Sequence, residues 1–288
     1  MVGVGEIMFT QMSNKEYHHG SLRAVVGSSM LKVALEDMNR YRAAYLDPRG
    51  PSKPPTPALM LGDMVHLICL EGLDECMKKY AIKPPELNKK GAKNQAKYAA
   101  WERSIGGARI TTQKLFDHAY RMSLALCNHE GFVSLQARSK CEETFTWTGD
   151  GVHQKIRPDM YDPKSGEWGD IKTCVDPLNF ENLSFRLGYH ISAAHYEAGL
   201  LEESHRTSCL GNHTFYVIDS NEPHTVYEKR FSNAAMEAGY EARAKALNRI
   251  RKAQDSGDWS EPRSKMTPIE VPSWYREYSK EVDTCAPF

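Results

Sequence analysis

The chain has 288 residues, of which 41% are hydrophobic and 26% are charged, as in a folded globule rather than a disordered chain. Lys plus Arg and Asp plus Glu each total 37, so the formal net charge is zero. This balance excludes a protein that is basic all over its surface. Any nucleic acid would have to be held by a local basic groove or channel.

Membrane and secretory segments are not indicated. No stretch approaches the roughly 18–20 apolar residues that span a bilayer, and residues 1–7 lack the basic and apolar regions of a secretory signal. The seven cysteines include no C-x-x-C pair, so neither a disulfide framework nor a zinc ribbon is indicated. We therefore expect a cytoplasmic protein without membrane contacts.

Helical periodicity dominates the first half of the chain, and alternation of apolar and polar residues begins near Lys140. The expected helices cover 28–45, 58–71, 94–105, 112–128, 177–203 (capped by Asp176) and 233–253. The expected strands cover 141–148, 152–162, 167–174, 213–219 and 225–231. We expect one α/β domain over 1–288, with a helical part at 1–139, a core at about 140–231, and a closing helix and tail at 232–288.

The most informative segment is a predicted hairpin whose turn is residues 163–166. Centring the hairpin on the middle of this turn places Asp159 opposite Asp170 and Arg157 opposite Lys172. Side chains alternate along a strand, so all four would point to one face, with directly opposed Cβ atoms about 4.5–5.5 Å apart. The hairpin thus predicts a pair of close carboxylates beside two cationic side chains.

Two carboxylates this close repel each other unless something neutralises them. Mg²⁺ does so in many proteins, held by one or two carboxylates and substrate phosphates, and a second ion about 3.5–4 Å away can clamp a phosphodiester. Lys172 would orient or deprotonate a water molecule or offset phosphate charge. The alternative is that Asp159 and Asp170 are solvent-facing strand residues, and a slip in register would remove the pairing.

The same residues carry a resemblance to known nucleases. Asp159 followed by Asp170-Ile171-Lys172 resembles the PD-(D/E)xK signature. Further segments, in order along almost the whole chain, resemble the RecE-type phage and prophage exonucleases (exonuclease VIII), which are related to lambda exonuclease. The resembling segments are 12–18, 28–31, 61–71, 157–159, 170–173, 189–196 and 272–274.

The resemblance implies a restriction-endonuclease-like α/β core, with a central mixed β-sheet flanked by helices. It implies a Mg²⁺-dependent 5′→3′ exonuclease on linear double-stranded DNA, with Mn²⁺ able to substitute and two ions in each active site. The product would be 3′ single-stranded DNA for recombination. The implied partners are double-stranded DNA, two further copies in a homotrimeric ring, and a single-strand-annealing recombination protein.

By the same resemblance, Asp159 and Asp170 would be metal ligands, the Ile171 carbonyl would complete the site, and Lys172 would be the catalytic lysine. His66 would be an additional metal ligand.

A lone histidine on an apolar helix is more often packed in the core. The favourable context is Gly62, which lies one turn before His66 on the same face and leaves room for a close approach.

Three further residues would support the site. Glu142 matches an acidic position of the family on the strand before the hairpin, although a surface strand residue is the equal alternative. Tyr196 matches the family on the later helix. Ser192 departs from it, because the family has glutamine there and serine reaches less far.

DNA contacts are expected at two places. The first helix begins near Ser29 and Lys32, and its free N–H groups would suit a terminal 5′-phosphate, with Arg23 assisting. Lys89 and Lys90 belong to a basic loop that would contact phosphates or, equally, form a solvated surface. The lysines of this loop and its flanks are Lys83, Lys89, Lys90, Lys93 and Lys97.

Two other functions remain open from the sequence. An endonuclease with the same core would cut closed circular DNA, whereas an exonuclease would not. A non-catalytic DNA-binding module is encouraged only by Ser192.

Overall fold

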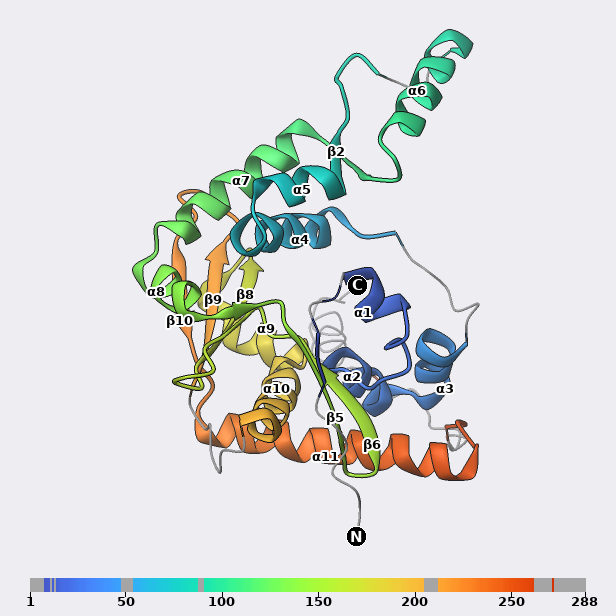
Figure 1. The fold of residues 1–288 in the computed structure, drawn as a ribbon, viewed down its shortest axis with the longest axis vertical. Coiled ribbons are helices and arrows are strands. Elements are labelled where there is room, and N and C mark those ends of the chain that lie inside the picture. Colours follow the sequence, from blue (N-terminus) through green and yellow to red (C-terminus); the bar gives the residue numbers. More distant parts are fainter. Residues whose placement is uncertain are drawn as a thin grey trace, which may run out of the picture.

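The computed structural model describes residues 8–10, 12, 14–47, 54–87, 91–204, 212–261 and 271 (Figure 1). Its α-helices are α1 (Asn14–His19), α2 (Ser28–Glu36), α3 (Met38–Tyr41), α4 (Pro57–Leu70), α5 (Leu73–Lys79), α6 (Ala92–Ser104), α7 (Gln113–Cys127), α8 (Glu130–Arg138), α9 (Phe180–Arg186), α10 (Tyr189–Ser204) and α11 (Asn233–Ser256). A π-helical turn, η1, spans Arg42–Leu46, and a 3₁₀ turn, η2, spans Pro177–Asn179. The strands are β1 (Met8–Thr10), β2 (Tyr80–Ile82), β3 (Arg109–Thr111), β4 (Lys140–Cys141), β5 (Thr144–Gly149), β6 (Val152–Ile156), β7 (Met160–Tyr161), β8 (Trp168–Cys174), β9 (His213–Asp219) and β10 (Val226–Lys229). None of the helices in these described ranges combines the length and the apolar character needed to cross a bilayer.

The central sheet has five strands in the order β10-β9-β8-β7-β4. β8 and β9 are parallel and the other neighbouring pairs are antiparallel, so the sheet is mixed. Parallel neighbours need a crossover connection, and here the chain passes through η2, α9 and α10. The mixed sheet flanked by helices confirms the predicted fold class. Two smaller sheets accompany it, an antiparallel β1-β5-β6 sheet and a parallel β2-β3 pair.

Alternation along β9 distributes the core between the two faces of the central sheet. Tyr216 and Ile218 lie in a buried cluster with residues of α4 and α7. Phe215 and Val217 lie in a second cluster with residues of α10 and α11. The sheet is therefore covered on both faces, and a polar site has room only at its ends or edges.

The hairpin of β7 and β8 has the predicted register. Met160 pairs with Gly169, and Tyr161 pairs with Trp168. Continuing this register by one residue places Asp159 opposite Asp170.

The expected pairing of Arg157 with Lys172 is wrong, because the described ladder ends at Met160. Pro158 has no N–H with which to extend it. β8 therefore runs past the end of β7 and leaves part of one edge open, and the backbone N–H of Ile171 on that edge donates to Asp159 Oδ2 at 2.7 Å.

The predicted helices at 28–45 and 177–203 are each divided. Asp37 ends α2 and caps α3 by accepting a hydrogen bond from the Arg40 N–H. The second division is at Gly188, whose φ of 66° interrupts the helix between α9 and α10. The sequence had suggested that Asp176 caps this helix, but the Asp176 side chain makes no capping hydrogen bond to η2.

The segment before α2 attaches the N-terminal helices to the rest of the fold. The Val26 N–H donates to the His153 carbonyl, and the Val26 carbonyl accepts from the Lys155 N–H of β6. α2 then packs on α11, with Leu31 and Leu247 in a shared buried cluster. These contacts hold α1 and α2 opposite α4.

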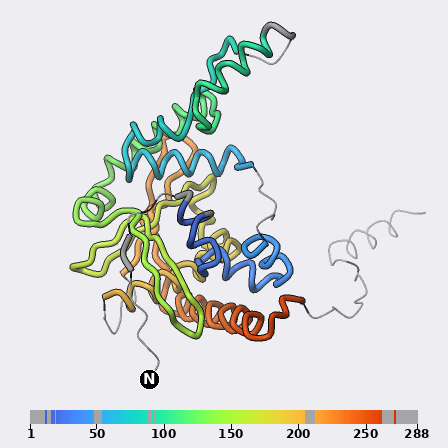
Figure 2. The backbone as a smooth tube through the Cα atoms, turned by 45° about the vertical axis from the view of Figure 1, so that its right-hand side comes forward, coloured from blue at the N-terminus to red at the C-terminus, as the bar shows by residue number. Residues whose placement is uncertain are grey.

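α6 stands away from the remainder of the molecule in both backbone views (Figures 1 and 2). We call residues 80–87 and 91–111 the arm. Its base is the parallel β2–β3 pair, which follows α5 and precedes α7. Three-residue strands carry no periodic pattern, so the sequence did not indicate this pair.

Candidate active site

α4 brings His66 to the open edge of β8. Thr56 begins the helix by accepting a backbone N–H with its side chain. The Nδ1 of His66 lies 2.7 Å from the Gly62 carbonyl oxygen. A Cβ on Gly62 would lie 3.3 Å from Thr173 Oγ1 on β8, so glycine allows the helix and the strand to approach closely.

Donor atoms from three separate elements meet at this edge. His66, Asp159 and Asp170 each offer one ligand atom, and these atoms lie within 4.8 Å of one another. His66 Nε2 is 3.0 Å from Asp159 Oδ2, and Lys172 Nζ is 2.5 Å from Asp170 Oδ1. The carbonyl oxygen of Ile171 lies 3.4 Å from Lys172 Nζ. The structure thus brings the predicted ligands and the predicted lysine together, while their roles stay predictions.

The pKa values of the two carboxylates are shifted in opposite directions. Burial raises the pKa of Asp159, but the charge and hydrogen bond of His66, with the charge of Lys172, outweigh it and hold that pKa below its usual range. Burial raises the pKa of Asp170 to about 6; Lys172 opposes this shift, and the Asp159 charge adds to it. The site therefore concentrates negative charge, which the cationic groups beside it, Lys172 and His66, balance.

His66 balances part of this charge. Burial lowers its pKa, but the charge and hydrogen bond of Asp159 outweigh that effect and raise the pKa to about 9. With Nδ1 directed at the Gly62 carbonyl, Nδ1 is the donor in the neutral ring, and the Nε2 lone pair faces Asp159. Loss of one proton therefore converts His66 from a counter-charge into a nitrogen ligand.

The donor set fits a divalent cation. Two carboxylates and an imidazole are ligands that Mg²⁺ and Mn²⁺ accept, Mn²⁺ tolerating nitrogen the better of the two. A cation bound among His66, Asp159 and Asp170 would supply positive charge where the protonated histidine supplies it now.

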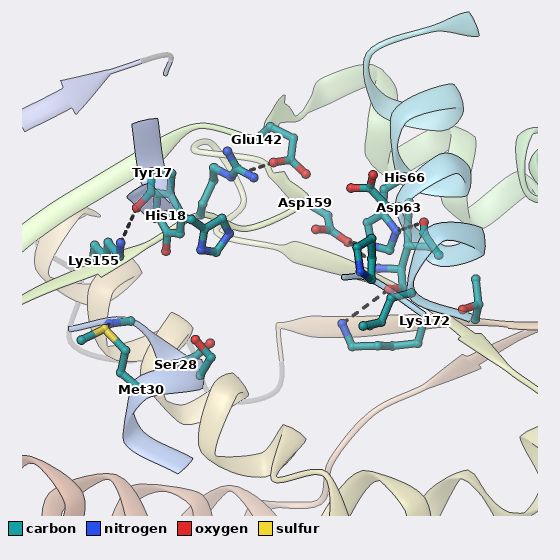
Figure 3. A pocket seen from close by; sticks show the side chains of 18 of the residues that line it. Tyr17, His18, Ser28, Met30, Asp63, His66, Glu142, Lys155, Asp159 and Lys172 are labelled. Atoms are coloured by element: carbon teal, nitrogen blue, oxygen red, sulfur yellow. Dashed lines mark hydrogen bonds and ion pairs between the residues drawn. The ribbon is translucent and has the colours of Figure 1, made fainter. Parts of the chain in front are cut away.

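His66, Asp159 and Lys172 line one side of a cavity of about 830 Å³. Figure 3 shows Tyr17 and His18 of α1 and Ser28 and Met30 of α2 across the cavity from His66. The candidate site thus lies between the open edge of β8 and the N-terminal helices.

Glu142 borders this cavity from a break between β4 and β5, which replaces the single strand expected over 141–148. Its φ of 55° lies in the left-handed region that non-glycine residues rarely adopt. Its Oε2 accepts from Arg157 Nε at 2.7 Å, and the Arg157 guanidinium lies 4.8 Å from the Tyr17 ring centre. Burial raises the pKa of Glu142 to about 7, with the Asp159 charge adding to the shift and Arg157 opposing it. Glu142 and Arg157 therefore form part of the cavity wall as an ion pair.

α10 contributes aromatic side chains. Tyr189 and Tyr196 both line the cavity, and Lys172 Nζ lies 5.1 Å from the Tyr189 ring centre. Ser192 is not among the described residues that line the cavity. Its expected support of the site stays a prediction.

The residues expected to contact DNA separate into three groups. Arg23 and Ser29 line the cavity, and Arg23 donates to the Asp47 carbonyl. Lys32 does not line it; its Nζ lies 5.2 Å from the Tyr189 ring centre. Burial and the Lys172 charge lower the pKa of Lys32 to about 8. Lys89 and Lys90 lie outside the described residues.

Sequence reasoning missed a charged cluster in the same cavity. Asp63 of α4 binds side chains from the end of α5, from β2 and from β3. The available signal was the three-residue spacing of Asp63 and His66, which places both on one helix face.

Comparisons with known proteins agree with this architecture. A search of curated proteins found no match. A crystal structure of a putative exonuclease from Eubacterium rectale superposes with a TM-score of 0.63, at 16% identity, over 91% of this chain and 97% of that chain. At this identity the similarity shows a shared fold. The family described as the PDDEXK-like domain of unknown function (DUF3799) matches residues 27–266. This chain belongs to that family.

Proposed function

We propose that this protein is a Mg²⁺-dependent 5′→3′ exonuclease of the RecE type. It would act as a single nuclease domain on linear double-stranded DNA and leave 3′ single strands for recombination. The family match supports a PD-(D/E)xK nuclease, and DNA is the substrate that such a nuclease implies. The direction of digestion, the ion and the recombination role are the parts that we add.

One observation carries the proposal. Ligand atoms of His66, Asp159 and Asp170 lie within 4.8 Å of one another, and Lys172 contacts the last of them. A cluster of this kind is costly for stability, since it buries like charges side by side. His66, Asp159 and Lys172 line the cavity, so a phosphodiester there can reach the cluster.

The side chains divide the chemistry among them. Asp159, Asp170 and neutral His66 would hold the cation, which when bound would neutralise phosphate charge and polarise the scissile bond. Lys172, held by Asp170 and by the Tyr189 ring face, would position the attacking water and share the developing negative charge. We propose two Mg²⁺ ions per site, replaceable by Mn²⁺, with the Ile171 carbonyl as a further ligand.

The start of α2 beside the cavity supports an exonuclease over an endonuclease. Gly27, Ser28 and Ser29, at the start of α2, line the cavity with Arg23. A helix N-terminus and a guanidinium both favour an anion. A 5′-phosphorylated strand end would be held there, while an uninterrupted duplex has no such end to offer.

The expected trimer and annealing partner also belong to the proposal. A ring of three copies around DNA would keep the enzyme on its substrate, and a single-strand-annealing protein would take the 3′ strand. Both rest on the resemblance to RecE-type enzymes.

Digestion of one linear duplex, labelled separately at each 5′ end and each 3′ end, tests the proposal. With Mg²⁺ we expect early release of 5′ label, retention of 3′ label, and no cleavage with EDTA. Closed circular duplex of the same sequence should persist. Cutting of the circle would favour an endonuclease, and no cleavage of any DNA with Mg²⁺ or Mn²⁺ would contradict nuclease function.

A further inference from the structure

Asp63 is the centre of a cluster that joins α4 to the base of the arm. Its Oδ1 accepts from Lys79 Nζ at 2.8 Å, and its Oδ2 accepts from the Tyr80 hydroxyl at 2.5 Å. Arg109 Nη1 lies 3.3 Å from the same Oδ2 and 3.4 Å from the Tyr80 oxygen. One carboxylate thus fixes two cationic side chains that come from sequence positions 30 residues apart.

The cluster belongs to the same cavity as the candidate metal ligands. Asp63, Lys79 and Arg109 all line it, and Figure 3 shows Asp63 beside His66 on α4. Side chains three residues apart on a helix have Cβ atoms about 5–6 Å apart. Phosphates recur every ~3.4 Å of axis along one DNA strand. A backbone seated at His66 would therefore pass the cluster within a few nucleotides.

The charge of the cluster is suited to an anion. Lys79 and Arg109 carry two positive charges and Asp63 carries one negative charge, so one positive charge remains. The side chains of Lys79 and Arg109 are 26% and 48% exposed, so a ligand in the cavity can reach both. A guanidinium has five N–H donors, and the bonds of Arg109 to Asp63 and Tyr80 use one of its three nitrogens.

We infer that Lys79 and Arg109 form a second phosphate-binding subsite, held in position by Asp63 and Tyr80. Its ligand is a backbone phosphodiester of the DNA being digested, a few nucleotides from the scissile bond. This inference rests on the proposed function. It assigns to the end of α5 and the base of the arm the task of aligning the duplex with α4, the helix that presents His66.

The test is equilibrium binding of a fluorescent 5′-phosphorylated duplex in EDTA, where no cleavage occurs, at several KCl concentrations. For the Lys79→Gln, Arg109→Gln double variant we expect at least a tenfold weaker Kd at about 100 mM salt. Each lost phosphate contact should reduce the slope of log K against log salt by about 0.9, so the slope should fall by nearly two. Lys79→Arg with Arg109→Lys keeps both charges and should retain most of the slope.

Lys78→Gln is the matched control. Lys78 is the neighbouring residue on α5, its side chain is 70% exposed, and its partner is Glu75 instead of Asp63. We expect its Kd to stay within twofold of wild type. Thermal unfolding of every variant would verify that each is folded at the assay temperature.

Three results have different meanings. If the Gln double variant binds DNA like Lys78→Gln while the wild type digests linear duplex, the subsite is wrong and the nuclease proposal stands. If the wild type digests no DNA, the nuclease proposal fails by itself, because the binding assay does not depend on cleavage. A weakened Kd with an unchanged salt slope would also overturn the subsite, since the loss would not come from phosphate contacts.

Discussion

His66 and His195 both lie on largely apolar helices, yet their surroundings differ in charge. On α4, His66 Nε2 faces the Asp159 carboxylate at 3.0 Å. On α10, His195 Nε2 lies 3.0 Å from the backbone carbonyl of Lys155, and its Nδ1 accepts from Arg243 Nε at 3.4 Å. The first histidine borders the cavity and pairs with a carboxylate there, and the second connects α10 to β6 and α11 inside the core.

The two environments shift the pKa values of the two imidazoles in opposite directions. Burial lowers the pKa of His195 to about 3, and the Arg243 cation adds to this shift. Burial also lowers the pKa of His66, but Asp159 outweighs it and raises the pKa to about 9. A buried histidine is therefore not in itself a sign of function. The charge of its partner separates a candidate ligand from a structural group.

The largest effect should come from removing a carboxylate beside His66. In Asp159→Asn or Asp170→Asn we expect the initial rate of duplex digestion with Mg²⁺ to fall at least about 100-fold, roughly 2.7 kcal/mol of barrier. Each change removes one negative ligand while preserving side-chain shape. A variant that retained more than a tenth of the rate would argue against the two-carboxylate site.

Loss of Lys172 should reduce turnover and spare the ligands. For Lys172→Met we expect at least about a tenfold lower rate, because the ammonium that contacts Asp170 at 2.5 Å is gone. Calorimetry should still detect Mn²⁺ binding, since His66, Asp159 and Asp170 remain. Near-normal turnover would place Lys172 outside the chemistry.

Matched alanine substitutions test the comparison of the two histidines directly. His66→Ala should lower the digestion rate at least about tenfold. His195→Ala should lower the free energy of unfolding by about 2–4 kcal/mol, through a cavity and two lost hydrogen bonds. Its rate per folded molecule should stay within twofold of wild type. Exchange of these two phenotypes would reverse the assignment of ligand and structural histidine.

Stability should also depend on pH with opposite signs for the two residues. The pKa of folded His195, about 3, is below the unfolded value of about 6.5, so its stabilisation is present above pH ~6.5 and is lost as pH falls. The pKa of folded His66, about 9, is above that value, so its contribution is present below pH ~6.5 and is lost as pH rises to about 9. Urea unfolding in EDTA from pH 4.5 to 9 would measure both slopes.

His195→Gln should flatten the acid side of that profile, and His66→Gln should flatten the alkaline side. The limiting slope for one group is about 1.4 kcal/mol per pH unit. Unchanged slopes in both variants would mean that other groups control the pH dependence.

Local pattern was sufficient to predict the hairpin that carries the candidate site. The turn composition at 163–166 and the period-two alternation fixed the register, and the observed pairing of Met160 with Gly169 follows it. The bounds of β9 were also predicted residue for residue, since turn-forming residues follow it and the strand alternates between two buried faces.

Long-range features could not be predicted in this way. His66 lies 3.0 Å from Asp159 across 93 positions of sequence, and only the resemblance to a nuclease family suggested that they meet. The left-handed conformation of Glu142 has no signature in composition. The binding of Arg109 by Asp63 depends on the parallel pairing of β2 and β3, which are too short to show a period.

Anomalous diffraction from crystals soaked in Mn²⁺ would test the candidate metal site most directly. We expect a peak at a coordination distance of about 2.0–2.3 Å from His66 Nε2 and from carboxylate oxygens of Asp159 and Asp170. The peak should disappear in Asp170→Asn, with Lys172 still in place. A peak elsewhere, or none in the wild type at saturating Mn²⁺, would contradict the assignment of these three residues as the metal ligands.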